Sequence, residues 1–149
     1  MTSKNSPVPV VMVFSGNDPS GGAGIQADIE ALLSHGCHTS PVITALTIQD
    51  TQDVLGYTPL DGDLIIEQAR AVLEDMPISA FKLGLLPTTE TVEAIHSILA
   101  DYPEIPVSVA STQTALLTGA WRSVRPVLTE RRAPCSAGCP ASTSRRCAG

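Results

Sequence analysis

Short runs rich in β-branched residues alternate with longer amphipathic segments through most of the chain. The runs lie at residues 8–14, 41–48, 78–85 and 105–109, and their composition predicts strands. The segments between them carry apolar residues three or four positions apart, which predicts helices. Strands that alternate with helices favour parallel pairing, so we predict an α/β fold with a mostly parallel sheet flanked by helices.

The predicted helices begin and end at recognisable signals. The first, at residues 25–34, is followed by Gly36, a residue type that commonly ends helices. The second and third follow candidate N-cap residues, Asp61 or Asp63 and Thr88 or Thr89. One face of the first helix is apolar, as expected for a face turned to a core. It comprises Ile25, Ile29, Leu32 and Leu33.

The composition narrows the class of protein and partner. The 149 residues fit a single domain. A net charge of −6 argues against nucleic acid and anionic membranes, which attract basic surfaces. No apolar run approaches the roughly 20 residues that a membrane helix needs. We therefore expect a cytoplasmic protein with no nucleic-acid and no membrane partner.

The charge pattern changes abruptly near Val107. Most basic residues follow this point, whereas all acidic residues except Glu130 precede it. Three of the four cysteines also follow it, without the spacing or the nearby histidine typical of a zinc site. We therefore expect residues 1–106 to form part of a folded domain and residues 107–149 to be an irregular or disordered tail.

The glycine-rich loop at residues 15–24 is the most informative segment. Ligands of parallel α/β sheets bind where the strands end, and glycines before a helix let backbone N–H groups approach a polar ligand. Two other segments also follow predicted strands, residues 49–51 and 84–87. The sequence therefore predicts a ligand site among these three segments.

Part of the loop also fits a rival pattern. Gly22-Ala-Gly24-Ile-Gln-Ala27 matches the dinucleotide fingerprint G-x-G-x-x-G/A, and Asp50 lies near the position of its acidic residue. This interpretation predicts an NAD-dependent oxidoreductase with a Rossmann-type loop. The loop does not fit a Walker A motif, because Gly22-Ala23 stands where Lys and Ser/Thr are required. A structural turn without a ligand is the third interpretation.

Three segments, in order, resemble one enzyme family. SGNDPSGGAGIQAD at 15–28, VITALTIQ at 42–49 and KLGL at 82–85 are similar to the hydroxymethylpyrimidine/phosphomethylpyrimidine kinases of thiamine biosynthesis, which have a ribokinase-like fold. The similarity runs from Val10 to Pro106. It implies that ATP, with Mg²⁺, phosphorylates 4-amino-5-hydroxymethyl-2-methylpyrimidine and then its monophosphate. It also suggests a homodimer.

The resemblance implies roles for three residues. Gln49 matches the glutamine that hydrogen-bonds the aminopyrimidine, and its amide offers a donor beside an acceptor. Asp28 matches an aspartate near the substrate, and Gly16 would keep a side chain away from the ring. The alternatives are a strand-end glutamine that bonds its own loop, a solvated surface aspartate and a simple turn glycine. Lys82 could reach an anionic substrate group, but a lysine that snorkels to solvent or is paired within the protein is the favoured interpretation.

The sequence departs from the family after the fourth predicted strand. The kinases continue with V-L-D-P-type and T-P-N-x-x-E-A segments and a later G-[ST]-G-C loop, which supplies the catalytic residue. These motifs are absent from the sequence. We therefore assign no catalytic residue and no metal ligand. The resemblance still implies a kinase, and we expect this chain to be a truncated one that lacks most of the ATP site and the catalytic half. A non-catalytic pyrimidine-binding fragment is the alternative function.

The origin of the divergent tail is a further hypothesis. Permitted codons from Glu130 to about Thr143, shifted by one base, give a string similar to the kinases. We therefore hypothesise that the tail is a frameshift product.

Overall fold

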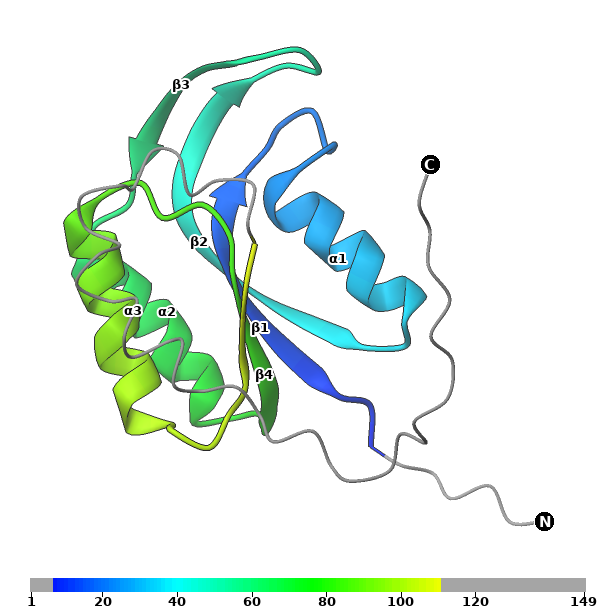
Figure 1. Ribbon diagram of the computed structural model, residues 1–149, viewed down its shortest axis with the longest axis vertical. Helices are drawn as coiled ribbons and strands as arrows, with labels where there is room; N and C mark the ends of the chain where they lie inside the picture. The colour runs from blue at the N-terminus through cyan, green and yellow to red at the C-terminus, as the bar shows by residue number, and fades with distance from the viewer. Residues whose placement is uncertain (1–6, 111–149) are drawn as a thin grey trace, which may run out of the picture.

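The computed structural model describes residues 7–110, which form a five-stranded sheet with helices on both faces. The strands follow the order β3-β2-β1-β4-β5 across the sheet (Figure 1). They are β1 (Val10–Asn17), β2 (His38–Gln49), β3 (Val54–Pro59), β4 (Ile78–Leu83) and β5 (Val107–Val109). The helices are α1 (Gly24–Ser34), α2 (Gly62–Leu73) and α3 (Thr89–Asp101). All pairs of neighbouring strands are parallel except β2 and β3, which confirms the predicted α/β class.

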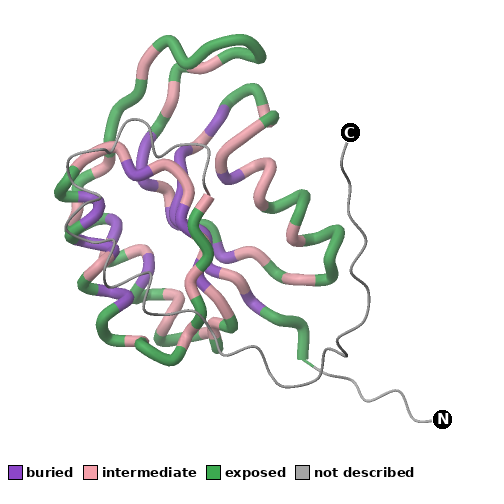
Figure 2. The backbone as a smooth tube through the Cα atoms, viewed as in Figure 1, coloured by how far each residue is buried: buried purple, intermediate pink, exposed green. Residues whose placement is uncertain are grey.

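The main core lies between the sheet and helices α2 and α3, which cover the same face (Figure 1). Alternate residues of the central strands point into it, including Phe14 of β1 and Phe81 of β4. Both side chains are fully buried, and their ring centroids lie 6.2 Å apart. Figure 2 shows the buried residues concentrated in this layer. The opposite face of β1 and β4 is covered by α1 (Figure 1).

The N-caps of α2 and α3 fall on predicted residues. The Asp61 carboxylate accepts a hydrogen bond from the Asp63 N–H, and the Thr88 hydroxyl accepts one from the Thr91 N–H. Each cap satisfies a backbone donor that the helix itself leaves unpaired. The pairs of candidates are thus resolved in favour of Asp61 and Thr88.

Strand β3 was not predicted from the sequence. It pairs antiparallel with β2 through a turn in which the Asp50 carboxylate accepts hydrogen bonds from the Gln52 and Asp53 N–H groups. Its residues include Gly56 and Pro59, types that weaken a strand signal and are tolerated at a sheet edge. The hairpin of β2 and β3 extends beyond the helices, and most of its outer residues are exposed (Figure 2).

The predicted packing of α1 is wrong for half of its apolar face. Ile25 is buried, but Ile29 is 38% exposed and Leu33 is 70% exposed. The physical reason is that α1 is the one helix on its face of the sheet within residues 7–110 (Figure 1). No second helix of that part of the chain packs beside it.

The strand predicted at residues 105–109 is present as β5, which pairs with β4 from Phe81 to Leu83. Residues 107–109 are therefore part of the sheet, although the charge pattern placed them in the irregular tail. Residues 111–149 of that tail, with Cys135, Cys139 and Cys147, lie outside the described residues. Within residues 7–110, none of the helices is long and apolar enough to span a bilayer.

Truncation of one core residue tests the packing of α2 on the sheet. We expect Ile65→Ala to lower the free energy of unfolding by about 2–5 kcal/mol, because Ile65 is fully buried and its loss leaves a cavity. Urea denaturation measures the effect. The matched control is Leu64→Ala in the same helix. Because Leu64 is 46% exposed, this variant should lose much less stability. Equal losses in both variants would contradict this burial pattern.

Candidate functional site

A pocket of about 260 Å³ opens on the α1 face, where the parallel strands end. Its walls come from the end of β1, the start of α1, β4 with the loop after it, and the residue after β5. The lining residues are Ser15, Ala23, Gly24, Asp28, Lys82, Gly84 and Ala110. Two of the three segments predicted to surround the site, residues 15–24 and 84–87, therefore contribute to it.

Asp18 holds the glycine-rich loop in shape. Its side chain is almost fully buried, and its carboxylate accepts hydrogen bonds from the Ser20 N–H at 2.8 Å, the Ser20 hydroxyl at 2.9 Å and the Ala23 N–H at 2.8 Å. Burial raises the pKa of this carboxyl, but hydrogen bonds from Ser20, Ala23 and Gly22 outweigh burial and lower it below its ordinary value. Asp18 is therefore an ionised loop anchor.

The first residue of α1 lies against the end of β1. Gly24 has a φ of +58°, and a Cβ at this position would lie 2.3 Å from the carbonyl oxygen of Gly16. A residue with a side chain would meet both a strained backbone and a backbone clash. Glycine at this position therefore lets the helix N-terminus approach the strand and form one wall of the pocket.

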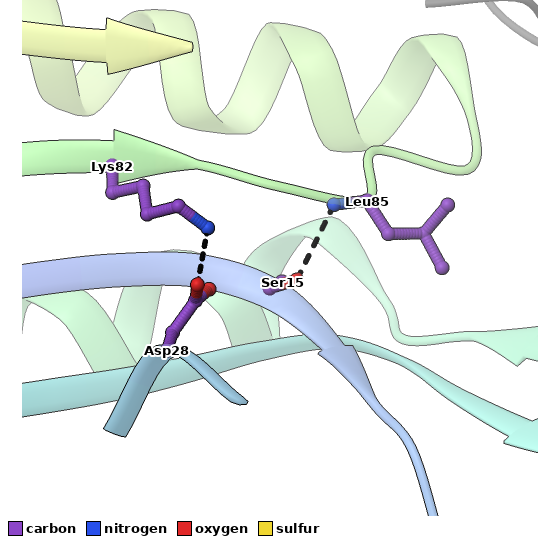
Figure 3. A network of polar contacts seen from close by, with 4 residues as sticks. All are labelled: Ser15, Asp28, Lys82 and Leu85. Atoms are coloured by element: carbon purple, nitrogen blue, oxygen red, sulfur yellow. Dashed lines mark hydrogen bonds and ion pairs between the residues drawn. The ribbon is translucent and has the colours of Figure 1, made fainter. Parts of the chain in front are cut away.

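Asp28 and Lys82 meet inside the pocket. Lys82 reaches from β4 to α1, where its Nζ donates to Asp28 Oδ1 at 2.5 Å (Figure 3). Only 13% of the Asp28 side chain and 28% of the Lys82 side chain are exposed. The alternative of a solvated surface aspartate is therefore wrong. The favoured interpretation of Lys82, a snorkelling or paired lysine, is confirmed in its second form.

Gly16 and Gln49 lie on the hairpin side of the strand ends. The Gln49 amide oxygen accepts a hydrogen bond from the Thr47 hydroxyl at 3.2 Å, and that hydroxyl also lies 2.9 Å from the Asn17 carbonyl oxygen. A Cβ on Gly16 would lie 2.9 Å from Leu85 Cδ2 and 3.5 Å from Thr47 Cγ2. Gly16 is thus close to both Thr47 and the start of α1, whereas Gln49 is outside the lining of the pocket.

Residues 7–110 contain no cluster of three or more histidine, cysteine, aspartate or glutamate side chains suited to a metal ion. The polar groups in and near the pocket suit an uncharged ligand that offers hydrogen-bond donors and acceptors: the Asp28 carboxylate, the Ser15 hydroxyl and, nearby, the Gln49 amide.

Comparison with known families identifies the chain. The family model described as phosphomethylpyrimidine kinase matches residues 18–131. The chain belongs to this family. The match continues past residue 106, where we expected the resemblance to the family to end.

A curated relative and a solved structure agree with the family. Hydroxymethylpyrimidine/phosphomethylpyrimidine kinase of Streptomyces coelicolor is 39% identical over 132 residues, which cover 84% of this chain and 49% of that protein. Phosphomethylpyrimidine kinase of Clostridium difficile has a TM-score of 0.64 and 36% identity, covering 69% of this chain and 44% of that one. The chain thus spans about half the length of these relatives.

A second solved structure has a similar fold. Pyridoxal kinase of Staphylococcus aureus, in complex with AMP-PCP and pyridoxal, has a TM-score of 0.68 and 23% identity, covering 82% of this chain and 45% of that one. These neighbours confirm the fold class that the resemblance implied, a ribokinase-like sheet of which this chain contains part. The family also argues against the Rossmann alternative. Asp50, its acidic residue, is bound within a hairpin turn.

Two side chains of the pocket with polar groups, Ser15 and Lys82, were not predicted as site residues. Ser15 lines the pocket, and its hydroxyl accepts a long hydrogen bond from the Leu85 N–H at 3.4 Å (Figure 3). Lys82 joins Asp28 although 54 positions separate them. A charged residue within an apolar strand, on the face opposite Phe81 and Leu83, was the signal available for Lys82.

The approach of Gly24 to Gly16 can be tested by adding one methyl group. We expect Gly24→Ala to lower the free energy of unfolding by more than the roughly 1–2 kcal/mol that a left-handed backbone costs a side chain, because the clash adds to it. Thermal and urea unfolding measure the loss. Gly21→Ala is the control, since Gly21 has a φ of +79° but no atom within 4 Å of its Cβ position. A smaller loss at Gly24 than at Gly21 would exclude the clash.

The anchor role of Asp18 predicts a pH dependence. Its pKa is lowered from 3.8, so its contribution to stability is complete above about pH 4 and is lost as the pH falls through the lowered value. We expect Asp18→Asn to be less stable than the unmodified chain at pH 6 and to lose less stability on acidification. Urea midpoints across this pH range test it, with the exposed Glu67→Gln as charge control. Parallel curves for the chain and Asp18→Asn would rule out the role.

Proposed function

We propose that this chain supplies the pyrimidine-binding part of a kinase that transfers the γ-phosphoryl group of ATP to 4-amino-5-hydroxymethyl-2-methylpyrimidine and then to its monophosphate. The family match over residues 18–131 is the observation that carries the proposal. The named activity of the Streptomyces coelicolor relative supports it. Use of ATP draws support from the pyridoxal kinase neighbour, whose structure is a complex with AMP-PCP. A role for Mg²⁺ rests on family membership alone.

Three residues are proposed to contact the pyrimidine. The Gln49 amide would pair with the amino group and the adjacent ring nitrogen, because one amide presents a donor beside an acceptor. Asp28 would accept a hydrogen bond from inside the pocket, which it lines. Gly16 lies close to Thr47 and to the start of α1, and it would let the flat ring approach the backbone, since it carries no side chain.

In phosphoryl transfer, this part of the chain is proposed to position the acceptor. Catalysis of this reaction consists mainly of positioning the acceptor and stabilising charge on the transferred group. The described residues fit the first task, because they surround a pocket with fixed polar groups. The second task requires cationic or N–H donors around the nucleotide phosphates, and we assign none of residues 7–110 to it. We propose no catalytic residue.

A non-catalytic pyrimidine-binding protein is the second candidate. The observation that favours it is the pocket itself: within residues 7–110 its lining offers groups that suit the pyrimidine, and we assign none of those residues to the nucleotide phosphates. Both candidates predict binding of the hydroxymethylpyrimidine, but only the kinase predicts release of ADP when ATP is added. Homodimer formation and a cytoplasmic location stay predictions.

Substitution of Gln49 tests the proposed binding mode. We expect Gln49→Glu to weaken binding of 4-amino-5-hydroxymethyl-2-methylpyrimidine by about tenfold or more, because a carboxylate lacks the N–H donor of the amide. Isothermal titration calorimetry on the full chain measures the dissociation constant. Gln52→Glu, an exposed change of the same charge in the neighbouring turn, should bind normally. Lack of binding by the unmodified chain would reject the proposed function.

A further inference from the structure

The ion pair between Lys82 and Asp28 uses only part of the aspartate. Lys82 Nζ contacts Oδ1, while Oδ2 is buried and has no hydrogen-bond partner within residues 7–110 (Figure 3). An ionised carboxylate can accept about four hydrogen bonds, and a buried acceptor left without one is costly. Asp28 lines the pocket, so a residue of the pocket carries an acceptor that no described group uses.

Lys82 is positioned to fix the orientation of the Asp28 carboxylate. It lies on β4 between Phe81 and Leu83, whose side chains are buried in the core on the other face. Its own side chain therefore lies on the α1 face and crosses to Asp28 (Figure 3). An ammonium group is a compact charge that pairs with one oxygen, so it can fix Oδ1 and leave Oδ2 for a ligand.

We propose that Lys82 is a positioning residue for the pyrimidine: it holds the Asp28 carboxylate so that Oδ2 accepts a hydrogen bond from a donor group of the ligand. The inference rests on the proposed function and adds to it a residue that does not itself need to touch the substrate. The donor is an N–H or O–H group, because Oδ2 of a carboxylate can only accept.

A purely structural role is the competing explanation. In that case the ion pair serves to attach α1 to β4, and any cation that restores the attachment restores the site. Arginine separates the two roles. Its planar guanidinium has paired donors that match both oxygens of a carboxylate, so in Lys82→Arg it should occupy Oδ2 as well as Oδ1.

The experiment measures unfolding and ligand binding in the same variants of the full chain. We expect Lys82→Met and Lys82→Arg each to raise the dissociation constant for 4-amino-5-hydroxymethyl-2-methylpyrimidine by about tenfold. Lys82→Arg should keep the urea midpoint of the unmodified chain, so it remains informative if Lys82→Met does not fold. Arg70→Met is the control, because Arg70 forms an exposed ion pair with Asp101 on the far side of the sheet and should bind normally.

Two further measurements identify the contact between Asp28 and the ligand. In an Asp28→Asn background, Lys82→Met should weaken binding little further, since both act on the same contact. The ligand 4-amino-2,5-dimethylpyrimidine, which lacks the hydroxyl, distinguishes the donors. If it too binds Lys82→Met about tenfold more weakly, the amino group is the donor, and if it does not, the hydroxyl is.

The results separate the inference from the function it rests on. If the unmodified chain binds the pyrimidine but Lys82→Arg restores both the midpoint and normal binding, the role of Lys82 is structural and the inference is overturned. If the unmodified chain does not bind the pyrimidine, the proposed function fails and the inference with it.

Discussion

The close contact between the start of α1 and the end of β1 is the constraint on which the site depends. It brings a helix N-terminus to the carbonyl of Gly16, and only a residue without a side chain allows the approach. Asp18 then anchors the intervening loop by accepting hydrogen bonds from Ser20 and Ala23. The position of Asp28, at the second turn of α1, follows from this junction, and so does its meeting with Lys82.

The two faces of the sheet have different roles. One face is apolar and is covered by α2 and α3, with Phe14 and Phe81 at its centre. The other face carries polar groups of β1 and β4 under a single helix, within the described residues. A hydrophobic core thus supports strands whose opposite side chains form the pocket, so stability and binding depend on alternate residues of the same strands.

The sequence predicted the parts of this structure that depend on local patterns. Capping residues such as Asp61 and Thr88 act on neighbouring N–H groups, so their role can be inferred from position alone. The exposure of Leu33 could not be inferred, because it depends on which elements lie beside α1. The pairing of Asp28 with Lys82 was also beyond local inference, because it requires the register of β4 against β1. The roles of Gln49 and Gly16 came from the family resemblance and stay predictions.

The central place of β1 has a consequence for how this pocket can change during evolution. Two parallel neighbours fix the register of the strand, β2 on one side and β4 on the other. A shift of one residue would turn Phe14 toward Asp28 and Ser15 toward the core. Substitutions at the pocket can therefore alter ligand preference gradually, whereas an inserted or deleted residue in β1 would exchange core and pocket in a single event. Variation among relatives should accordingly be confined to side chains there, with length changes tolerated in the hairpin turn at residues 50–53.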